Sequence, residues 1–439
     1  MSIKKLYAEG LFPGKILLLG LLLISAPFYS FSQAIRPLSY YLETAARNNP
    51  ALKENSNRQS LNAIQKNIIS AQVSTPQVSL TGDYLLSPFF NSNGKAVEIT
   101  NNPSAKAFGY DVGITNGGLY SALLNINVPL FTRKISAPLF LQNKIQQDQL
   151  TNEQLAIAHE LGNKVTTQFI ETFQLQQQIQ SARELLNLLT DRIVIAKKLM
   201  EKGLLPAGDY LLLQIEYGNT ANDTLDLEMK FNAGIGLLNN LCGISDTTIV
   251  QLEMPVLEIS PLKTSFNYLE KYRIDSLGNA ALEKVFNVKY QPQLNLFGNT
   301  GLNASYAPDM ARNLGLSAGV HLAVPIYDGH QKKLIGSLSR INQQILDDNK
   351  TNIALQLKNS LRLLENAIGK KQNIITRQQE QLKQYQTLLR VYREQAVNGQ
   401  LSVIVFTTAL SQYKTVQQKI SQEQTDLLLL ISNYNYLNW

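Results

Sequence analysis

Two segments of the chain show the 3-4 spacing of apolar residues that is typical of long helices packed as coiled coils. The same register occurs twice, from Ile179 to Met200 and again 196 residues later, from Ile375 to Ala396. After Pro138 neither segment has an interior proline, so each is predicted to be one continuous helix. A helix from about residue 132 to about residue 200 would be ~100 Å long. The first seam consists of Ile179, Ala182, Leu186, Leu189, Ile193, Ala196 and Met200.

Each predicted long helix is followed by a glycine and then by a second apolar seam. Gly203 and Gly399 can adopt the left-handed conformation that ends a helix, and Pro206 suits the first turn of a returning helix. Because short connections make consecutive helices antiparallel, each half is predicted to form a long helical hairpin. The apolar tip residues are expected to lack an intramolecular partner. The tips are therefore expected to dock a partner protein. The alternative is that both glycines are only caps and that the leucines pack inside an oligomer. The predicted docking residues are Gly203, Leu204, Leu205, Pro206, Asp209, Gly399, Leu401 and Val403.

Upstream of each hairpin the apolar period changes from about 3.6 to 2. Four segments, residues 78–87, 120–130, 294–306 and 316–326, carry apolar residues at even positions and mostly Asn, Ser, Thr or Gly at odd positions. Their length and alternation are typical of transmembrane β-strands, with the apolar side facing lipid and the polar side facing a lumen. The alternative is a pair of soluble β-hairpins with one face on a core.

A repeated motif ends the second strand of each half and indicates a duplication. The first copy is Val128-Pro129-Leu130-Phe131 and the second is Val324-Pro325-Ile326-Tyr327. Residues 33–242 are therefore expected to form a first structural repeat, 243–265 an irregular linker, and 266–439 a second repeat. The second repeat has a shorter leading helix, because Asp275 to Pro292 is a shorter interval than Pro50 to Pro76. The stretch 91–118 is expected to be a long extracellular loop whose shorter partner lies within 301–315.

The N-terminal segment 1–32 is predicted to be a secretory signal peptide. Lys4 and Lys5 form its basic start, residues 16–24 its apolar core, and Ser30 and Ser32 the small residues before a cut at Gln33. No later run of 18 apolar residues follows. A single cysteine excludes a disulfide framework, and the net charge of +7 is too dispersed to indicate nucleic-acid binding.

The sequence contains no recognisable catalytic or cofactor motif. There is no metal-binding His-Glu-x-x-His, phosphate-binding loop or nucleophile elbow. His159-Glu160 is interpreted as a solvated or interhelix pair, His321 as a lumen-lining side chain, and Cys242 as a buried small hydrophobe. We therefore expect no enzyme activity, no cofactor and no metal site.

Four strands cannot close a barrel, and an open sheet edge is not tolerated in lipid. Three chains would supply twelve strands and remove every edge. The alternative function class is a structural coiled-coil protein of the cell envelope, which would have no need of the alternating strands.

The sequence resembles the outer-membrane efflux protein family, the TolC-like channels. The residues that carry the resemblance are Leu38 to Pro50, the strand starts Pro76-Gln77-Val78-Ser79-Leu80 and Pro292-Gln293-Leu294-Asn295-Leu296, the two exit motifs and the two glycine-led tips. The resemblance implies a mainly α chain with a transmembrane β-barrel part. Long antiparallel coiled-coil hairpins would form a trimeric α-barrel, and four strands per chain would complete a 12-stranded trimeric β-barrel.

The resemblance also implies a function and partners. It implies an outer-membrane protein with a large periplasmic part, acting as the passive exit duct of a tripartite export system. Its partners would be two further copies of the chain, a periplasmic adaptor (membrane fusion) protein, an inner-membrane pump of the RND or ABC type, and outer-membrane lipid. The alternative within the family is the outer-membrane channel of a type I protein secretion system. Val405 and Thr408 stand where similar channels often carry carboxylates, which puts an acidic ring at the periplasmic mouth in doubt.

Overall fold

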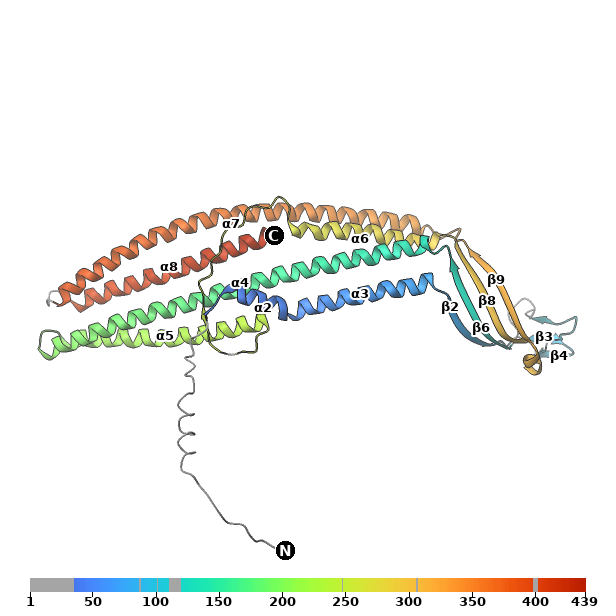
Figure 1. Ribbon diagram of the computed structural model, residues 1–439, viewed down its shortest axis with the longest axis horizontal. Coiled ribbons are helices and arrows are strands. Elements are labelled where there is room, and N and C mark those ends of the chain that lie inside the picture. Colours follow the sequence, from blue (N-terminus) through green and yellow to red (C-terminus); the bar gives the residue numbers. More distant parts are fainter. Residues whose placement is uncertain are drawn as a thin grey trace, which may run out of the picture.

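The protein is a long, curved molecule with a sheet at one end and helices running away from it (Figure 1). The computed structural model describes residues 35–86, 88–100, 102–109, 120–246, 248–304, 307–397 and 402–439. The predicted signal segment 1–32, Gly399 and Leu401 lie outside the described residues, as does the side chain of Val403.

Two helical hairpins make up about half of the chain. The first pairs α4 (Arg133–Glu201) with α5 (Ala207–Cys242), and the second pairs α7 (Gln331–Val397) with α8 (Val403–Leu437). The expected continuous helix from about residue 132 to about residue 200 is therefore confirmed. Shorter helices lead into the strands: α2 (Leu38–Asn48) and α3 (Pro50–Ser74) in the first half, and α6 (Glu270–Asn287) in the second. Asn49 separates α2 from α3, because its side chain accepts a hydrogen bond from the amide of Ala51 and Pro50 begins the next helix.

The strands form one antiparallel sheet in the order β2-β6-β8-β9. Their bounds are β2 (Gln77–Tyr84), β6 (Tyr120–Leu130), β8 (Gln293–Ala304) and β9 (Leu314–Ala323). Strands β6 and β8 come from different halves of the chain, so the sheet joins the two repeats. Each strand continues into a helix of its own, and the helices keep the order of the strands. The result is a single curved layer with α4 next to α6 and α8, and α7 beyond them.

Three sequence-based expectations about the strands need correction. The fourth strand was expected to reach Ile326, but β9 ends at Ala323, opposite Gln293, where β8 begins. Val324, Pro325 and Tyr327 therefore follow the strand, whereas Val128 and Pro129 lie within β6 and Phe131 directly after it. Strand β2 is shorter than expected and ends at Tyr84. The expected long loop also contains a small sheet of its own, formed by β3 (Phe89–Ser92), β4 (Lys95–Glu98) and β5 (Phe108–Gly109).

The segment after α5 crosses the middle of the helical layer. Its short strand β7 (Gln251–Leu252) pairs in parallel with β1 (Ile35–Arg36) at the start of the described chain. Further on, the amides of Ser260 and Lys263 donate to the side chains of Asn435 and Asn438 near the C-terminus. The stretch expected to be an irregular linker thus contacts both the start of the described residues and the C-terminal end of α8.

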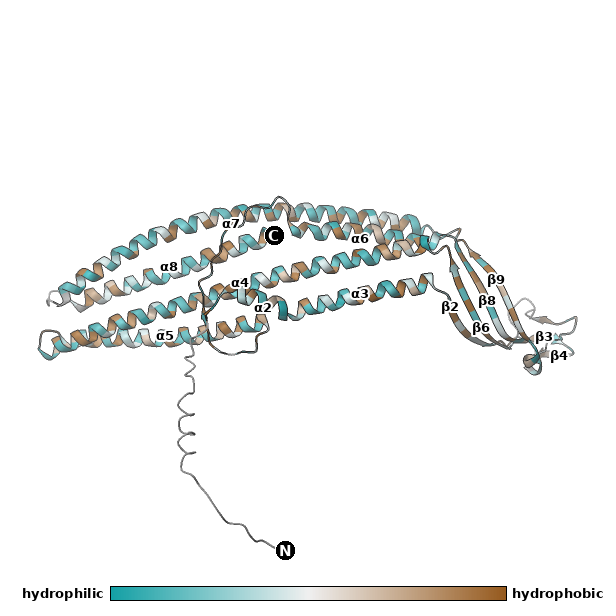
Figure 2. Ribbon diagram, viewed as in Figure 1, coloured by the Kyte–Doolittle hydropathy of each residue, from teal (hydrophilic) through white to brown (hydrophobic). Residues whose placement is uncertain are grey.

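Apolar packing is divided into several clusters along the layer instead of one central core. One lies between α2, α4 and α5, around Tyr41, Phe169 and Leu238. A second lies at the hairpin ends, where Leu189 of α4 meets Leu389 of α7 and Leu410 of α8. The helices have mixed hydrophobic and polar positions along their whole length (Figure 2). A layer one helix thick buries only stripes of each helix, which explains why the coiled-coil pattern dominates the sequence.

Candidate functional site

The four-stranded sheet has one apolar and one polar face, and no other described element packs across either face. Residues directly opposite one another in the register share a face, so Leu80, Leu124, Thr300 and Leu316 point the same way. The apolar face consists of Val78, Leu80, Tyr84, Tyr120, Ala122, Leu124, Ile126, Val128, Leu130, Leu294, Leu296, Leu302, Leu314, Leu316, Val320 and Leu322, with Gly298, Thr300, Ala304 and Ala318 among them. Leu80 and Leu316 are 79% and 83% exposed. Such a face requires a covering that the single chain does not supply.

The opposite face is built mostly from amides and hydroxyls. Asn125 donates to the hydroxyl of Thr81 at 2.8 Å, and Ser121 donates to the carboxylate of Asp83 at 3.0 Å. His321 lies on this face opposite Asn295, on the side expected for it. The Phe297 ring lies over Gly319, where any larger residue would collide with it. The face is therefore polar and sparsely charged.

The second exit motif orders the turn from β9 into α7 through a residue that the sequence analysis did not single out. Asp328 accepts hydrogen bonds from the amides of His330 and Lys332 at 2.9 and 2.8 Å, and from the hydroxyl of Tyr290. Gly329 and His330 both have positive φ, which makes the turn sharp. The Gly329 that follows Asp328 could have identified this turn. Tyr327 is 78% exposed, and its ring lies edge-to-face against His330, with centroids 5.8 Å apart.

The tip of the first hairpin is described in full, and it corrects two expectations, one for Leu205 and one for Pro206. Gly203 has φ of +70° and ends the helix, as expected of a turn residue. Leu204 is 69% exposed, but Leu205 packs into the cluster at the hairpin ends and so has an intramolecular partner. Pro206 is the cap residue before α5 instead of a member of its first turn, and Asp209 lies in that first turn. At the second tip, Ser402 caps α8 by accepting from the amide of Ile404, and Val405 is exposed.

Of the residues considered for chemistry, Cys242 and His159 lie in packed environments, whereas Glu160 and His321 are exposed. Cys242 is fully buried, donates to the carbonyl of Tyr41 at 3.4 Å, and burial raises its pKa to about 11. His159 stacks between the rings of Tyr436 and Trp439, with centroids 4.8 and 4.3 Å away, and its Nε2 donates to the carbonyl of Tyr436. Desolvation lowers the pKa of His159. Glu160 is exposed and pairs with Lys164, whereas His159 contacts α8, which agrees with the interpretation of these two residues as solvated or interhelix side chains. The aromatic cluster could not have been found from local spacing, because its members are far apart in the sequence.

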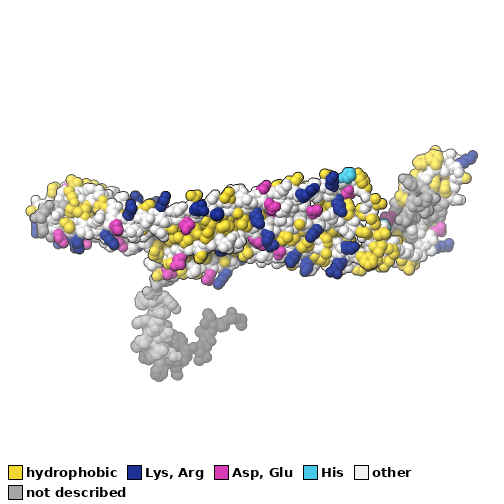
Figure 3. Space-filling view, turned by 90° about the horizontal axis from the view of Figure 1, so that it is seen from above, with side chains coloured by type: hydrophobic (Ala, Val, Ile, Leu, Met, Phe, Trp, Pro, Cys, Tyr) yellow, Lys and Arg dark blue, Asp and Glu magenta, His cyan; other side chains and the backbone are white. Residues whose placement is uncertain are grey.

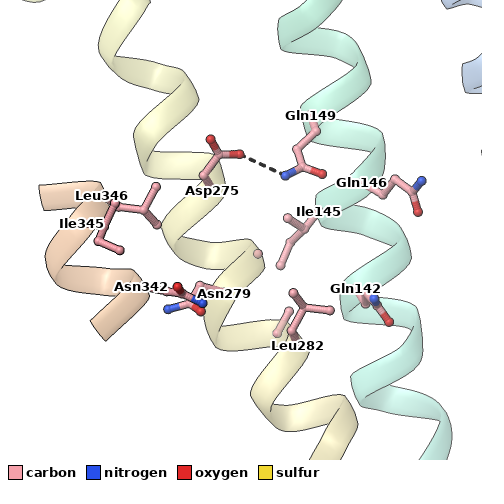
Figure 4. A pocket seen from close by; sticks show the side chains of 12 residues that line it. Gln142, Ile145, Gln146, Gln149, Asp275, Asn279, Leu282, Asn342, Ile345 and Leu346 are labelled. Atoms are coloured by element: carbon pink, nitrogen blue, oxygen red, sulfur yellow. Dashed lines mark hydrogen bonds between the residues drawn. The ribbon is translucent and has the colours of Figure 1, made fainter. Parts of the chain in front are cut away.

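A cavity of about 470 Å³ lies between α4, α6 and α7, in the half of the helical layer that adjoins the sheet. Figure 4 shows the side chains that line it. Its lining is rich in side-chain amides, including Gln142, Gln146 and Asn342, and Gln149 donates to Asp275 across it at 3.1 Å. Ser276 and Asn279 of α6 bond to Gln343 and to the backbone of Ser339 on α7. These contacts hold the three helices together, so we interpret the cavity as part of the packing of the layer.

Two features are absent from the described part of the chain. None of its helices combines the length and apolarity needed to cross a membrane. No three His, Cys, Asp or Glu side chains within it are grouped so that they could bind a metal ion.

Comparison with solved structures shows what this architecture is similar to. The outer membrane protein VceC from Vibrio cholerae is 13% identical, with a TM-score of 0.67 over 91% of this chain and 96% of that chain. The CmeC outer membrane channel of Campylobacter jejuni is 12% identical, with a TM-score of 0.68 over 91% of this chain and 85% of that chain. The open MtrE outer membrane channel of Neisseria gonorrhoeae is 11% identical, with a TM-score of 0.64 over 91% of this chain and 88% of that chain. The chain has the fold of these outer-membrane proteins. The resemblance stated from the sequence is thus confirmed for the fold, although no protein-family model and no curated protein sequence matches the chain.

Proposed function

We propose that the protein is the outer-membrane exit duct of a tripartite export system, acting as a homotrimer with a large periplasmic part. The observation that carries the proposal is the sheet with an exposed apolar face, an uncovered polar face and two free edges. In lipid the apolar face is covered by acyl chains, the polar face lines water, and the edges must be closed. Three copies would close twelve strands, with β9 of one copy pairing with β2 of the next.

The outer helices of the layer support the same arrangement. Exposed apolar residues recur at helical spacing along α3, α5 and α7, which lie at the two borders of the layer, and each series resembles a coiled-coil seam without its partner. In the view from the α7 side, apolar side chains lie exposed among the charged ones (Figure 3). The series are Leu61, Ile64 and Ile68 on α3, Leu211, Ile215, Leu225 and Met229 on α5, and Leu334, Leu338, Ile341 and Ile345 on α7. A second copy placed along each border would bury them.

The hairpin tips are the proposed docking points for a periplasmic adaptor protein, which would connect the duct to an inner-membrane pump of the RND or ABC class. The tips lie at the end of the molecule opposite the sheet (Figure 1). Leu204 is the exposed apolar residue of the first tip, beside Gly203, whereas Leu205 belongs to the packing behind it. An exposed leucine at this position fits a transient protein contact.

The proposal is tested by the cellular location of the protein and by its oligomeric state. The full chain is expressed in a Gram-negative host, membranes are fractionated, and the detergent-purified protein is measured by light scattering. We expect outer-membrane recovery, a particle with three copies of the chain, and stepwise conductance after insertion into planar bilayers. A monodisperse monomer, or recovery with the soluble fraction, contradicts the proposal.

A further inference from the structure

A cavity of about 440 Å³ lies near the hairpin ends and gathers three arginines. Arg192 comes from α4, and Arg390 and Arg393 come from α7. Phe406 and Tyr413 of α8 contribute aromatic rings to the wall. Among the residues that line the cavity, Asp191 is the one carboxylate. Three guanidinium charges against one carboxylate leave an excess of two positive charges around a single space.

These arginines have no ion-pair partner within the described part of the chain. The guanidinium carbon of Arg192 lies 5.2 Å from the centroid of the Phe406 ring, and its Nε is buried without a hydrogen-bond partner. Desolvation, followed by the charge of Arg393, lowers the pKa of Arg192, while the neighbouring Asp191 acts in the opposite direction. A buried guanidinium nitrogen without an acceptor is costly, so an acceptor bound from outside would stabilise the site.

The helices that carry the arginines belong to different hairpins. Both α4 and α7 pack on α8, which lies between them. The like charges on α4 and α7 therefore repel each other across the cavity unless an anion lies between them. A bound anion would reverse this repulsion and connect the two hairpins directly, close to their tips.

We propose that this cavity binds a dianionic phosphate group and thereby fastens α4 to α7. Guanidinium groups present paired donors that match the oxygens of phosphate, and three of them can share one dianion. The cavity is also lined by Leu188, Ile195 and Leu389. Together with the two aromatic rings these residues accommodate a small apolar substituent, so inorganic phosphate and a phosphate monoester share the chemistry that the site recognises.

Isothermal titration of the full detergent-purified protein tests the site. Inorganic phosphate and phenyl phosphate are each titrated at constant ionic strength, with chloride as the background anion. We expect saturable binding of both, tighter for phenyl phosphate because of Phe406 and Tyr413. Arg393→Gln and Arg390→Gln should each weaken binding about tenfold or more, since each removes a charge-assisted contact. Arg377→Gln is the matched control, because Arg377 lies on α7 but outside the cavity, and it should bind like the unmodified protein.

Hydrogen exchange supplies a second readout that does not depend on heats of binding. Phosphate should slow amide exchange at residues 185–196 of α4 and 386–396 of α7, with no change along α3. The exposed side chains of Arg390 and Arg393 can be replaced without disturbing the packing around Phe406. The proposal is overturned if neither compound binds saturably, or if Arg390→Gln and Arg393→Gln bind both compounds as tightly as Arg377→Gln. Binding of phosphate but not of phenyl phosphate would restrict the ligand to the free ion.

Discussion

The two halves of the chain match closely between the sheet and the tips, and differ where their elements end in the middle of the layer. Helices α4 and α7 have 69 and 67 residues, and α5 and α8 have 36 and 35. The leading helices are unequal: α2 and α3 have 11 and 25 residues, whereas α6 has 18. Corresponding helices of the two halves have nearly equal lengths where they span the distance from the sheet to the tips. The leading helices can differ in length, because a returning helix continues the layer where the leading helix ends, as α8 does beyond α6.

The largest effect is expected when the helical hairpin of only one half is shortened, because the two hairpins then no longer have equal lengths. Lys371 on α7 pairs with Glu423 on α8 at 2.5 Å, which sets the register of that hairpin. Deleting residues 376–382 and 413–419 removes one heptad from each helix and draws the second tip back by ~10 Å. Leu189 and Leu410 would then no longer meet, and each such loss of a buried leucine contact costs ~2–5 kcal/mol.

Thermal unfolding and the yield of assembled protein measure this effect. We expect the one-sided deletion to prevent assembly. The control deletes residues 180–186 and 225–231 as well, which shortens both hairpins equally and should restore much of the yield. Equal yields for the two deletions would show that the lengths need not match.

Equivalent strand positions in the two halves should respond equally to a charge. Leu124 and Val320 are 196 residues apart and lie on the same apolar face, with exposures of 39% and 61%. If this face contacts lipid, Leu124→Arg and Val320→Arg should each cost ~2–4 kcal/mol and reduce the amount of folded protein in the outer membrane. Asn127→Arg and Ser317→Arg, on the opposite face, are the matched controls and should have little effect. If only one of the two apolar-face variants reduces the amount of folded protein, then Leu124 and Val320 lie at different depths in the membrane.

At the first tip, substitutions of the adjacent residues Leu204 and Leu205 should distinguish an effect on docking from an effect on folding stability. Leu204→Asp should abolish export without changing the melting temperature, because the side chain is 69% exposed and lies outside the cluster at the hairpin ends. Leu205→Asp should lower stability by ~1–3 kcal/mol, since it places a charge in the cluster at the hairpin ends. Export assays and thermal unfolding of both variants provide the comparison. Normal export by Leu204→Asp, with assembly intact, would rule out docking at this residue.

The smallest expected difference in stability between the two halves is at the C-terminal ends of α5 and α8. Cys242 and Asn438 are 196 residues apart, and both are buried. Asn438 bonds to the amide of Lys263 and to Ser260 and Pro261, so Asn438→Ala leaves buried partners unsatisfied and should cost ~2–3 kcal/mol. Cys242→Ala should cost ~1 kcal/mol, because a small apolar group is lost.

The Cys242 thiol also makes a pH-dependent contribution to stability. Its pKa of about 11 in the folded protein lies above the ordinary thiol value, so the unfolded chain loses this proton first. The thiol's contribution is therefore present below about pH 8.5 and is lost as pH rises toward 11. Denaturant unfolding should give a lower free energy of unfolding at pH 9.5 than at pH 7, and Cys242→Ala should remove the thiol's part of this decrease.

The sequence predicted those parts of the fold that repeat locally. Heptad spacing and the absence of interior proline predicted α4 and α7, and strict alternation predicted the two faces of the sheet. The end of β9 was missed, because it depends on where β8 begins and not on the residues of β9. Contacts between distant segments were also missed, including the stacking of His159 on Tyr436 and Trp439 and the burial of Leu205. Local periodicity contains no information about such partners.

The parallel pairing of β1 with β7 has a consequence for biogenesis. A chain that crosses the inner membrane from its N-terminus presents Ile35 and Arg36 first, but Gln251 and Leu252 follow only after the whole first hairpin has emerged. Strand β1 would therefore stay unpaired while the apolar series of α3 and α5 are already exposed. Contacts between such distant segments form slowly. If the protein is exported as proposed, the nascent chain would need holding factors during this interval, and β1 could pair only after the segment that follows α5 has emerged.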